Sequence, residues 1–63
     1  MIKKICTKKI KNFTYILRFF ESDNQYIIYK QNDAILEDGK IHHIPIEAIF
    51  NNEKDARAYL KKL

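Results

Sequence analysis

The chain has few of the residues that cross-link or stiffen a small protein: one cysteine, one proline and one glycine, with no tryptophan. The single cysteine, Cys6, excludes an internal disulfide, because a disulfide needs two. Apolar stretches are also short, since Thr14, Arg18 and Lys30 interrupt them well before the roughly 20 residues that span a bilayer. We therefore expect neither a disulfide scaffold nor a membrane protein.

The length of 63 residues leaves room for one small domain, residues 1–63. Domains of this size bury only about 60% of the surface that their unfolded chains expose, so their stability is marginal. Such domains usually gain stability from a disulfide, a structural metal or self-association. Because the disulfide is excluded, we expect the chain to associate with itself as a homodimer.

The first twenty residues contain no acidic residue, and the chain as a whole carries a net charge of +4. Their cations are Lys3, Lys4, Lys8, Lys9, Lys11 and Arg18. AT-rich codons supply lysine together with isoleucine, asparagine, tyrosine and phenylalanine, in which the chain is also rich, so codon usage and function are both open explanations of this basicity. The same lysines interrupt the apolar core that a signal peptide requires, so we expect a cytoplasmic protein.

Alternating apolar residues predict a hairpin in the first half of the chain. The residues at every second position of its first strand are Phe13, Tyr15, Leu17 and Phe19. Aromatic and β-branched residues at this period are typical of a strand. A polar turn over residues 21–24 follows, and residues 26–29 resume an antiparallel strand. We expect the odd positions of the first strand to face a helix.

A second, shorter hairpin is predicted farther along. Residues 34–36 lead into Asp38-Gly39, a pair suited to a two-residue turn, and residues 41–44 continue the return strand. Pro45 cannot donate to a β-ladder, so it marks the end of that strand.

Two segments do not follow either period. Residues 45–50 form either a short helical turn, begun by Pro45, or an extended edge segment. In residues 1–10 the apolar side chains match neither helix nor strand spacing, and we expect a short edge strand there.

Near the carboxyl end the period changes to 3.6 residues, which predicts a helix from Asn52 to Leu63. Asn52 is suited to cap it, and the acidic first turn and basic last turn suit the helix dipole. Its apolar stripe consists of Ala56, Tyr59, Leu60 and Leu63. The predicted fold is therefore α+β: an antiparallel meander of about three to five strands, open or curled toward an SH3-like barrel, with one C-terminal helix packed on one face.

One helix covers only one face of a sheet, and the other face of the predicted hairpin is also apolar. Ile16, Phe20 and either Ile28 or Tyr29 remain there after the first face is assigned to the helix. Contiguous exposed apolar surface is unusual on soluble monomers. Curling of the sheet, a second copy of the chain or a partner protein would bury these residues, which are our candidates for protein binding.

Basic residues are the candidates for nucleic-acid binding. The helix adds a second basic stripe opposite its apolar face, and the complete candidate set is Lys3, Lys4, Lys8, Lys9, Lys11, Lys54, Arg57 and Lys61. Lysines of this kind contact phosphates with salt-sensitive affinity and no sequence preference. They also protect edge strands from foreign sheets or simply solvate a helix face. Both explanations remain open.

The residue types that carry catalysis or bind metal are sparse. His42 and His43 are neighbours in a predicted strand and face opposite ways, so they cannot chelate one ion together. Ser22 lies in a turn, and Cys6 has no identified base. We expect no enzyme activity, no cofactor, no metal and no small-molecule substrate.

A strand ending in Phe50, an asparagine cap and a helix beginning Glu53-Lys54-Asp55-Ala56 resemble the ending of many small phage and mobile-element sheet-plus-helix proteins. The same ending resembles that of the three-stranded arm-binding domains of some integrases. The resemblance covers the last fifteen residues and concerns shape, so it assigns no functional residue. It implies a phage or mobile-element origin.

These observations favour a non-enzymatic protein-binding module, an inhibitor or regulatory subunit, that acts through an apolar sheet face and edge. The alternative is a nucleic-acid-binding protein that uses the basic amino-terminal strand and the basic helix face. Fold alone does not choose between them.

Overall fold

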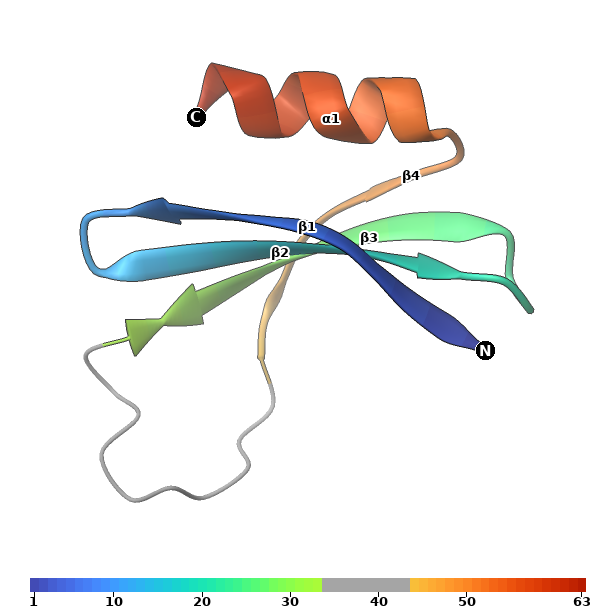
Figure 1. Ribbon diagram of the computed structural model, residues 1–63, viewed down its shortest axis with the longest axis horizontal. Helices are drawn as coiled ribbons and strands as arrows, with labels where there is room; N and C mark the ends of the chain where they lie inside the picture. The colour runs from blue at the N-terminus through green and yellow to red at the C-terminus, as the bar shows by residue number, and fades with distance from the viewer. Residues whose placement is uncertain (34–43) are drawn as a thin grey trace.

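The computed structural model describes residues 1–33 and 44–63 of the chain. It contains a four-stranded antiparallel sheet in meander order, with a C-terminal helix on one side (Figure 1). The elements are β1 (Ile2–Ile10), β2 (Phe13–Phe20), β3 (Gln25–Asn32), β4 (Ile46–Phe50) and α1 (Glu53–Lys62). The predicted α+β meander with one packed helix is confirmed.

The β2–β3 hairpin lies where alternation predicts it. Leu17 of β2 is directly opposite Ile28 of β3, and both side chains are completely buried. The turn between the strands includes Asn24, whose φ of 53° is in the left-handed region that asparagine tolerates better than most residues. Strand β3 continues to Asn32 and is therefore longer than predicted.

A bulge in the amino-terminal strand explains why the apolar residues of residues 1–10 are irregularly spaced. β1 pairs with β2 along its length, but the register shifts between Lys4 and Cys6, which leaves Ile5 as an extra residue. A bulge of this kind interrupts two-residue alternation, so consecutive residues Ile5 and Cys6 are both half-buried. The predicted edge strand is confirmed, and it is a long one of nine residues.

Residues 45–50, predicted as either a helical turn or an extended edge segment, contain an extended strand. β4 pairs with β3, placing Ala48 opposite Ile28 and Phe50 opposite Tyr26. The predicted Asp38-Gly39 hairpin falls largely on residues 34–43, outside the described part of the chain. Ile44 and Pro45 precede β4 without strand structure.

The sheet is open, with β1 and β4 at its two edges. The alternative of curling toward an SH3-like barrel is therefore wrong. The helix α1 contacts β3 and β4. Figure 1 shows α1 lying along one side of the sheet.

The helix begins and ends as its sequence predicts. The Asn52 side-chain oxygen accepts a hydrogen bond of 2.8 Å from the Asp55 backbone N–H, and the Leu63 N–H donates to the Leu60 carbonyl oxygen at the other end. Within the described residues no helix is long and apolar enough to cross a membrane.

The core lies between α1 and the sheet and consists of Tyr15, Leu17, Ile28, Ala56 and Leu60. Phe13 packs against this cluster from the side, and Tyr15 and Leu17 belong to it, as expected of the odd positions of β2. The predicted helix stripe needs one correction. Leu63 follows the last helical residue, is 39% exposed and lies outside the core.

Candidate functional site

The side of the sheet away from α1 is the first candidate site. Directly paired residues of neighbouring strands share a face, so the register defines this surface. Its apolar residues are Ile2, Ile16, Phe20, Ile27, Tyr29, Ile46 and Ile49. Its cations are Lys4, Lys9 and Arg18, and its uncharged polar residues are Thr7, Thr14, Gln25 and Gln31. We call this surface the open face, because no described element packs over it.

Exposure of the open face increases toward its margins. Ile16 and Ile27, on the two central strands, are each 8% exposed. Ile2, Ile46 and Ile49, on the edge strands, are 58%, 52% and 50% exposed. Three isoleucine side chains at the margins are therefore about half exposed. Covering them with a partner would be favourable by roughly 25 cal/mol for each Å² of apolar surface removed from water.

Two aromatic rings and a guanidinium form a cluster on β2 and β3, the two central strands of the open face. The rings of Phe20 and Tyr29 lie 6.4 Å apart, centroid to centroid, and are tilted by 47°. The guanidinium carbon of Arg18 lies 5.3 Å from the centroid of Tyr29. All three side chains are half-buried. Their mutual contacts restrict their motion, which lowers the entropy lost when a partner binds.

The structure separates the predicted protein-binding residues. Ile16, Phe20 and Tyr29 gather on the open face, whereas Ile28 is completely buried beneath α1. Between the two alternatives for β3, Tyr29 is therefore the residue on the open face, and Ile28 is a core residue. The reason is the register, which pairs Tyr29 with Ile16 and Ile28 with Leu17.

Four apolar residues of the open face were missing from the sequence prediction: Ile2, Ile27, Ile46 and Ile49. Alternation from Tyr29 identifies Ile27 once the face of Tyr29 is known. The others depend on strands that the sequence left ambiguous. The bulge in β1 and a register shift in β4 between Ile46 and Ala48 both break simple alternation.

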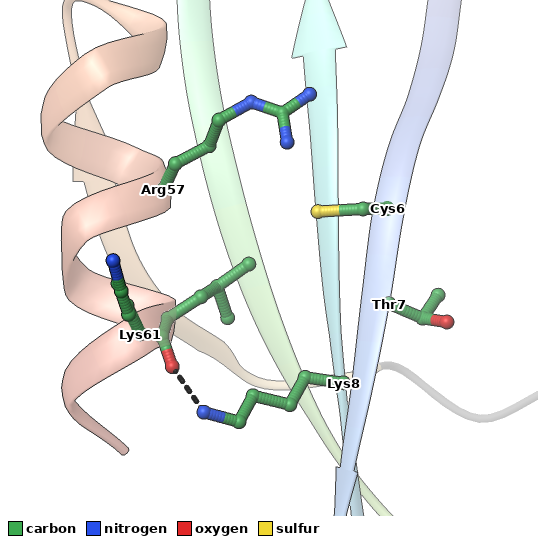
Figure 2. Close-up of a pocket in the computed structure, with 6 residues that line it drawn as sticks. Cys6, Thr7, Lys8, Arg57 and Lys61 are labelled. Carbon is green, nitrogen blue, oxygen red and sulfur yellow. Dashed lines mark hydrogen bonds between the residues drawn. The ribbon is translucent and has the colours of Figure 1, made fainter.

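The second candidate site is a shallow groove between β1 and α1. One part, of about 240 Å³, is lined by Cys6, Thr7, Lys8, Arg57, Leu60 and Lys61. An adjoining hollow of about 440 Å³ is lined by Lys3, Lys4, Ile5, Phe19, Tyr26, Glu53 and Arg57. Arg57 borders both parts, and we call the two hollows together the β1–α1 groove. Figure 2 shows Arg57 and Lys8 reaching from opposite walls across its first part.

Two cations of the groove are already engaged. The Lys8 ammonium donates hydrogen bonds to the Leu60 carbonyl oxygen, at 2.8 Å, and to the Leu63 carbonyl oxygen, at 3.3 Å. Figure 2 marks the first of these bonds. The Arg57 guanidinium donates to the Glu53 carboxylate, and this hydrogen bond raises the pKa of Arg57 further above its ordinary value. Both contacts reduce the positive charge available to a ligand.

The predicted nucleic-acid-binding residues divide between the surfaces. Lys3, Lys8, Arg57 and Lys61 line the groove, Lys4 borders it and belongs to the open face, and Lys9 lies on the open face alone. Lys11 lies in the β1–β2 turn with a φ of 54°, and Lys54 is exposed on α1 and lines neither part of the groove. The eight residues therefore do not form a single surface.

The remaining chemistry-bearing residues that the structure describes form no recognisable centre. Cys6 is free and half-buried at the groove. Among residues 1–33 and 44–63 there is no group of three or more His, Cys, Asp or Glu side chains that could hold a metal ion. His42 and His43 lie outside these ranges. Comparison with known proteins adds no assignment, since no family model, curated protein or solved structure matches the chain.

Proposed function

We propose that the chain is a small non-enzymatic protein-binding module, an inhibitor or regulatory subunit, and that the open face is its contact surface. One observation carries this proposal: three half-exposed isoleucines surround an aromatic and arginine cluster on a face that no described element covers. Exposed apolar patches with a polar margin are typical of protein interaction sites.

The composition of the open face also supports protein binding. Tyrosine, phenylalanine and arginine are enriched in the centres of protein interfaces, and tyrosine and arginine are frequent among the residues that dominate binding energy. Phe20 and Arg18 lie on β2 and both contact the Tyr29 ring on β3, so the three side chains belong to the central strands of the face. Aliphatic residues around them favour a protein over a nucleic acid, whose bases and phosphates offer little apolar surface to isoleucine.

The β1 edge is a poorer contact surface than the open face. This strand carries Lys3, Lys4, Lys8 and Lys9 and contains a bulge. Lysines and bulges on an edge strand oppose pairing with another sheet. We therefore assign the contact to the face of the sheet, and treat the β1 lysines in part as protection against edge pairing.

A pair of aspartate substitutions tests the proposal. Ile49→Asp places a charge on the open face, and Ala58→Asp places the same charge on the exposed outer side of α1. Each variant and the original chain are used as bait in extracts of the cells that produce the protein, and are measured by light scattering for self-association. We expect a partner, or a second copy, that is retained by Ala58→Asp and lost by Ile49→Asp. Equal behaviour of the two folded variants would contradict the proposal.

A second candidate function is favoured by the β1–α1 groove. Five of the eight predicted cations, from elements far apart in sequence, line the two hollows of this groove. Such a basic groove suits the sugar-phosphate backbone of a nucleic acid, with affinity that falls steeply as salt rises. Engagement of Lys8 with carbonyl oxygens and of Arg57 with Glu53 weakens this candidate.

Fluorescence anisotropy with a labelled single strand and a labelled duplex tests the second candidate. The double variant Lys3→Gln with Lys61→Gln removes two groove cations, and Lys54→Gln with Lys62→Gln removes two exposed cations of α1 that do not line the groove. Groove binding predicts a larger loss of affinity and a larger drop in salt dependence for the first pair. Equal losses would exclude the groove as a distinct site.

A further inference from the structure

The open face has an uneven distribution of charge. Its three cations, Lys4, Lys9 and Arg18, all lie on β1 and β2. The half formed by β3 and β4 is uncharged and exposes Ile46 and Ile49. None of the strand residues that form the face is acidic. A partner that covers the whole face therefore meets a basic half beside an apolar half.

One carboxylate next to the face, that of Asp33, already accepts hydrogen bonds from within the chain. Asp33 follows β3 and accepts hydrogen bonds from the Thr14 hydroxyl, at 2.8 and 3.1 Å, and from the Gln31 amide, at 3.1 Å. Both donors belong to the open face. Asp33 therefore fixes the end of the face, and Arg18, on the central strand β2, has the Tyr29 ring but no carboxylate as its described neighbour on the face.

Covering Arg18 requires a carboxylate from the partner. A guanidinium that loses its water without gaining an anionic partner is strongly unfavourable, whereas a charge-assisted pair offsets that loss. A second copy of this chain docked face to face would bring the cations of both copies together, and none of the described strand residues that form the face is acidic. The occupant that fits has carboxylates where the face has Arg18 and Lys4.

The shape of the apolar half indicates the structure of the occupant. Two neighbouring strands are about 10 Å across, because strands lie about 4.8 Å apart, and this width matches the diameter of an α-helix. The helix α1 packs against β3 and β4 from the other side. The same two strands therefore already support one amphipathic helix and have an apolar reverse side for a second, which would complete a three-layer arrangement.

We propose that the open face binds an amphipathic helix of a partner protein, with the apolar stripe over β3 and β4 and a row of carboxylates on the flank facing Arg18 and Lys4. This inference rests on the proposed function and specifies the partner. It predicts electrostatic steering, so association slows as salt increases while the apolar contact persists.

Two labelled peptides of about 18 residues, long enough for a helix of several turns, test the inference by fluorescence anisotropy. Both carry the same leucine stripe; one has glutamates along a single flank and the other has glutamines there. We expect the glutamate peptide to bind about tenfold more tightly than the glutamine peptide, a preference that Arg18→Gln or Lys4→Gln reduces. Lys62→Gln, exposed at the far end of α1, is the matched control and leaves binding unchanged.

Three results would overturn the inference. Equal binding of both peptides would show that the partner needs no acidic flank. Binding that is unchanged by Arg18→Gln and Lys4→Gln would show that the basic half of the face does not take part. If neither peptide binds, the proposal that the open face binds a helix of a partner protein is wrong. Circular dichroism identifies any variant that fails to fold. If one of the two cation variants is unfolded, the other alone still tests the inference.

The proposed function is judged separately, by Ile49→Asp against Ala58→Asp. If light scattering shows a dimer that Ile49→Asp alone dissociates, a second copy occupies the open face. The protein-binding function then stands and the acidic helix is wrong. If neither variant changes any association, the function itself is contradicted, whatever the peptides do.

Discussion

The Lys8 ammonium lies 2.8 Å from the Leu60 carbonyl oxygen, although the two residues are 52 positions apart in the chain. The same ammonium also reaches the Leu63 carbonyl oxygen at 3.3 Å. Carbonyl groups in the last turn of a helix lack partners within the helix and carry its partial negative charge. Lys8 therefore fastens the carboxyl end of α1 to the edge strand across the β1–α1 groove.

Removing this cation should destabilise the fold. Lys8→Met keeps the length of the side chain and loses the hydrogen bonds, so we expect the free energy of unfolding to fall by about 1 kcal/mol. Lys9→Met is the matched control, because Lys9 is the next residue of β1 and faces the other side of the sheet. Urea denaturation measures both variants. A loss no larger for Lys8→Met than for Lys9→Met would show that the contact contributes little.

The cap of α1 should be equally measurable. The Asn52 side chain accepts from the Asp55 N–H at 2.8 Å and donates to the Asp55 carboxylate at 2.9 Å. We expect Asn52→Ala to lower stability by about 1 kcal/mol, as for other N-caps. The adjacent Asn51→Ala, also exposed, should change stability little. Thermal unfolding of the two variants separates a capping effect from the loss of an asparagine.

The contact between Tyr59 and Glu47 predicts a dependence on alkaline pH. The Tyr59 hydroxyl donates to the Glu47 carboxylate at 2.5 Å, and this hydrogen bond, followed by burial, raises the pKa of Tyr59. A raised pKa in the folded state contributes stability below the unfolded-state pKa, and that contribution is lost as pH rises through the folded-state value.

The stability difference between the original chain and Tyr59→Phe should therefore be largest at neutral pH and should shrink as the pH rises above the ordinary tyrosine pKa of about 10. Urea denaturation across this range measures the difference. Glu47→Gln should also lower the Tyr59 pKa in a spectroscopic titration, because it removes the main cause of the shift. A stability difference that does not change with pH would contradict the assignment.

Asp33 predicts the opposite dependence, at acid pH. Hydrogen bonds from Gln31 and then Thr14 lower the pKa of Asp33 below its ordinary value. Its contribution to stability is present above the unfolded-state pKa and is lost as pH falls through the folded-state pKa. We expect Asp33→Asn to be less stable than the original chain at neutral pH and to approach it as the pH falls below the ordinary aspartate pKa of about 3.9.

Asp23→Asn is the matched control for this titration, because Asp23 is an exposed aspartate in the β2–β3 turn. Its effect on stability should be smaller at neutral pH. An Asp33→Asn curve that runs parallel to that of the original chain at all pH values would show that the hydrogen bonds to Asp33 do not stabilise the fold.

Local patterns predicted those parts of the fold where periodicity is unbroken. The alternation of β2 and the cap and apolar residues of α1 identified the hairpin, the helix and most of the core, because burial and period agree there. The β1 strand was harder, because its bulge at Ile5 shifts the register by one residue. One extra residue exchanges the two faces for every position that follows.

The candidate surfaces were less predictable than the fold. Placing Tyr29 rather than Ile28 on the open face required the pairing of β2 with β3, which alternation within one strand does not supply. Predicting the β1–α1 groove would have required the position of α1 relative to β1, which depends on tertiary packing. No pattern in sequence indicates that Lys8, counted among phosphate-binding candidates, donates to carbonyl oxygens of the helix instead.

Photo-crosslinking in the producing cells tests the central claim most directly. Ile49 on the open face, Lys61 in the β1–α1 groove and Ala58 on the outer side of α1 are each replaced with a benzophenone-bearing amino acid. The account predicts a covalent protein adduct from position 49 and none from position 58. Adducts to nucleic acid from position 61, with no protein adduct from position 49, would contradict it and identify the groove as the functional surface.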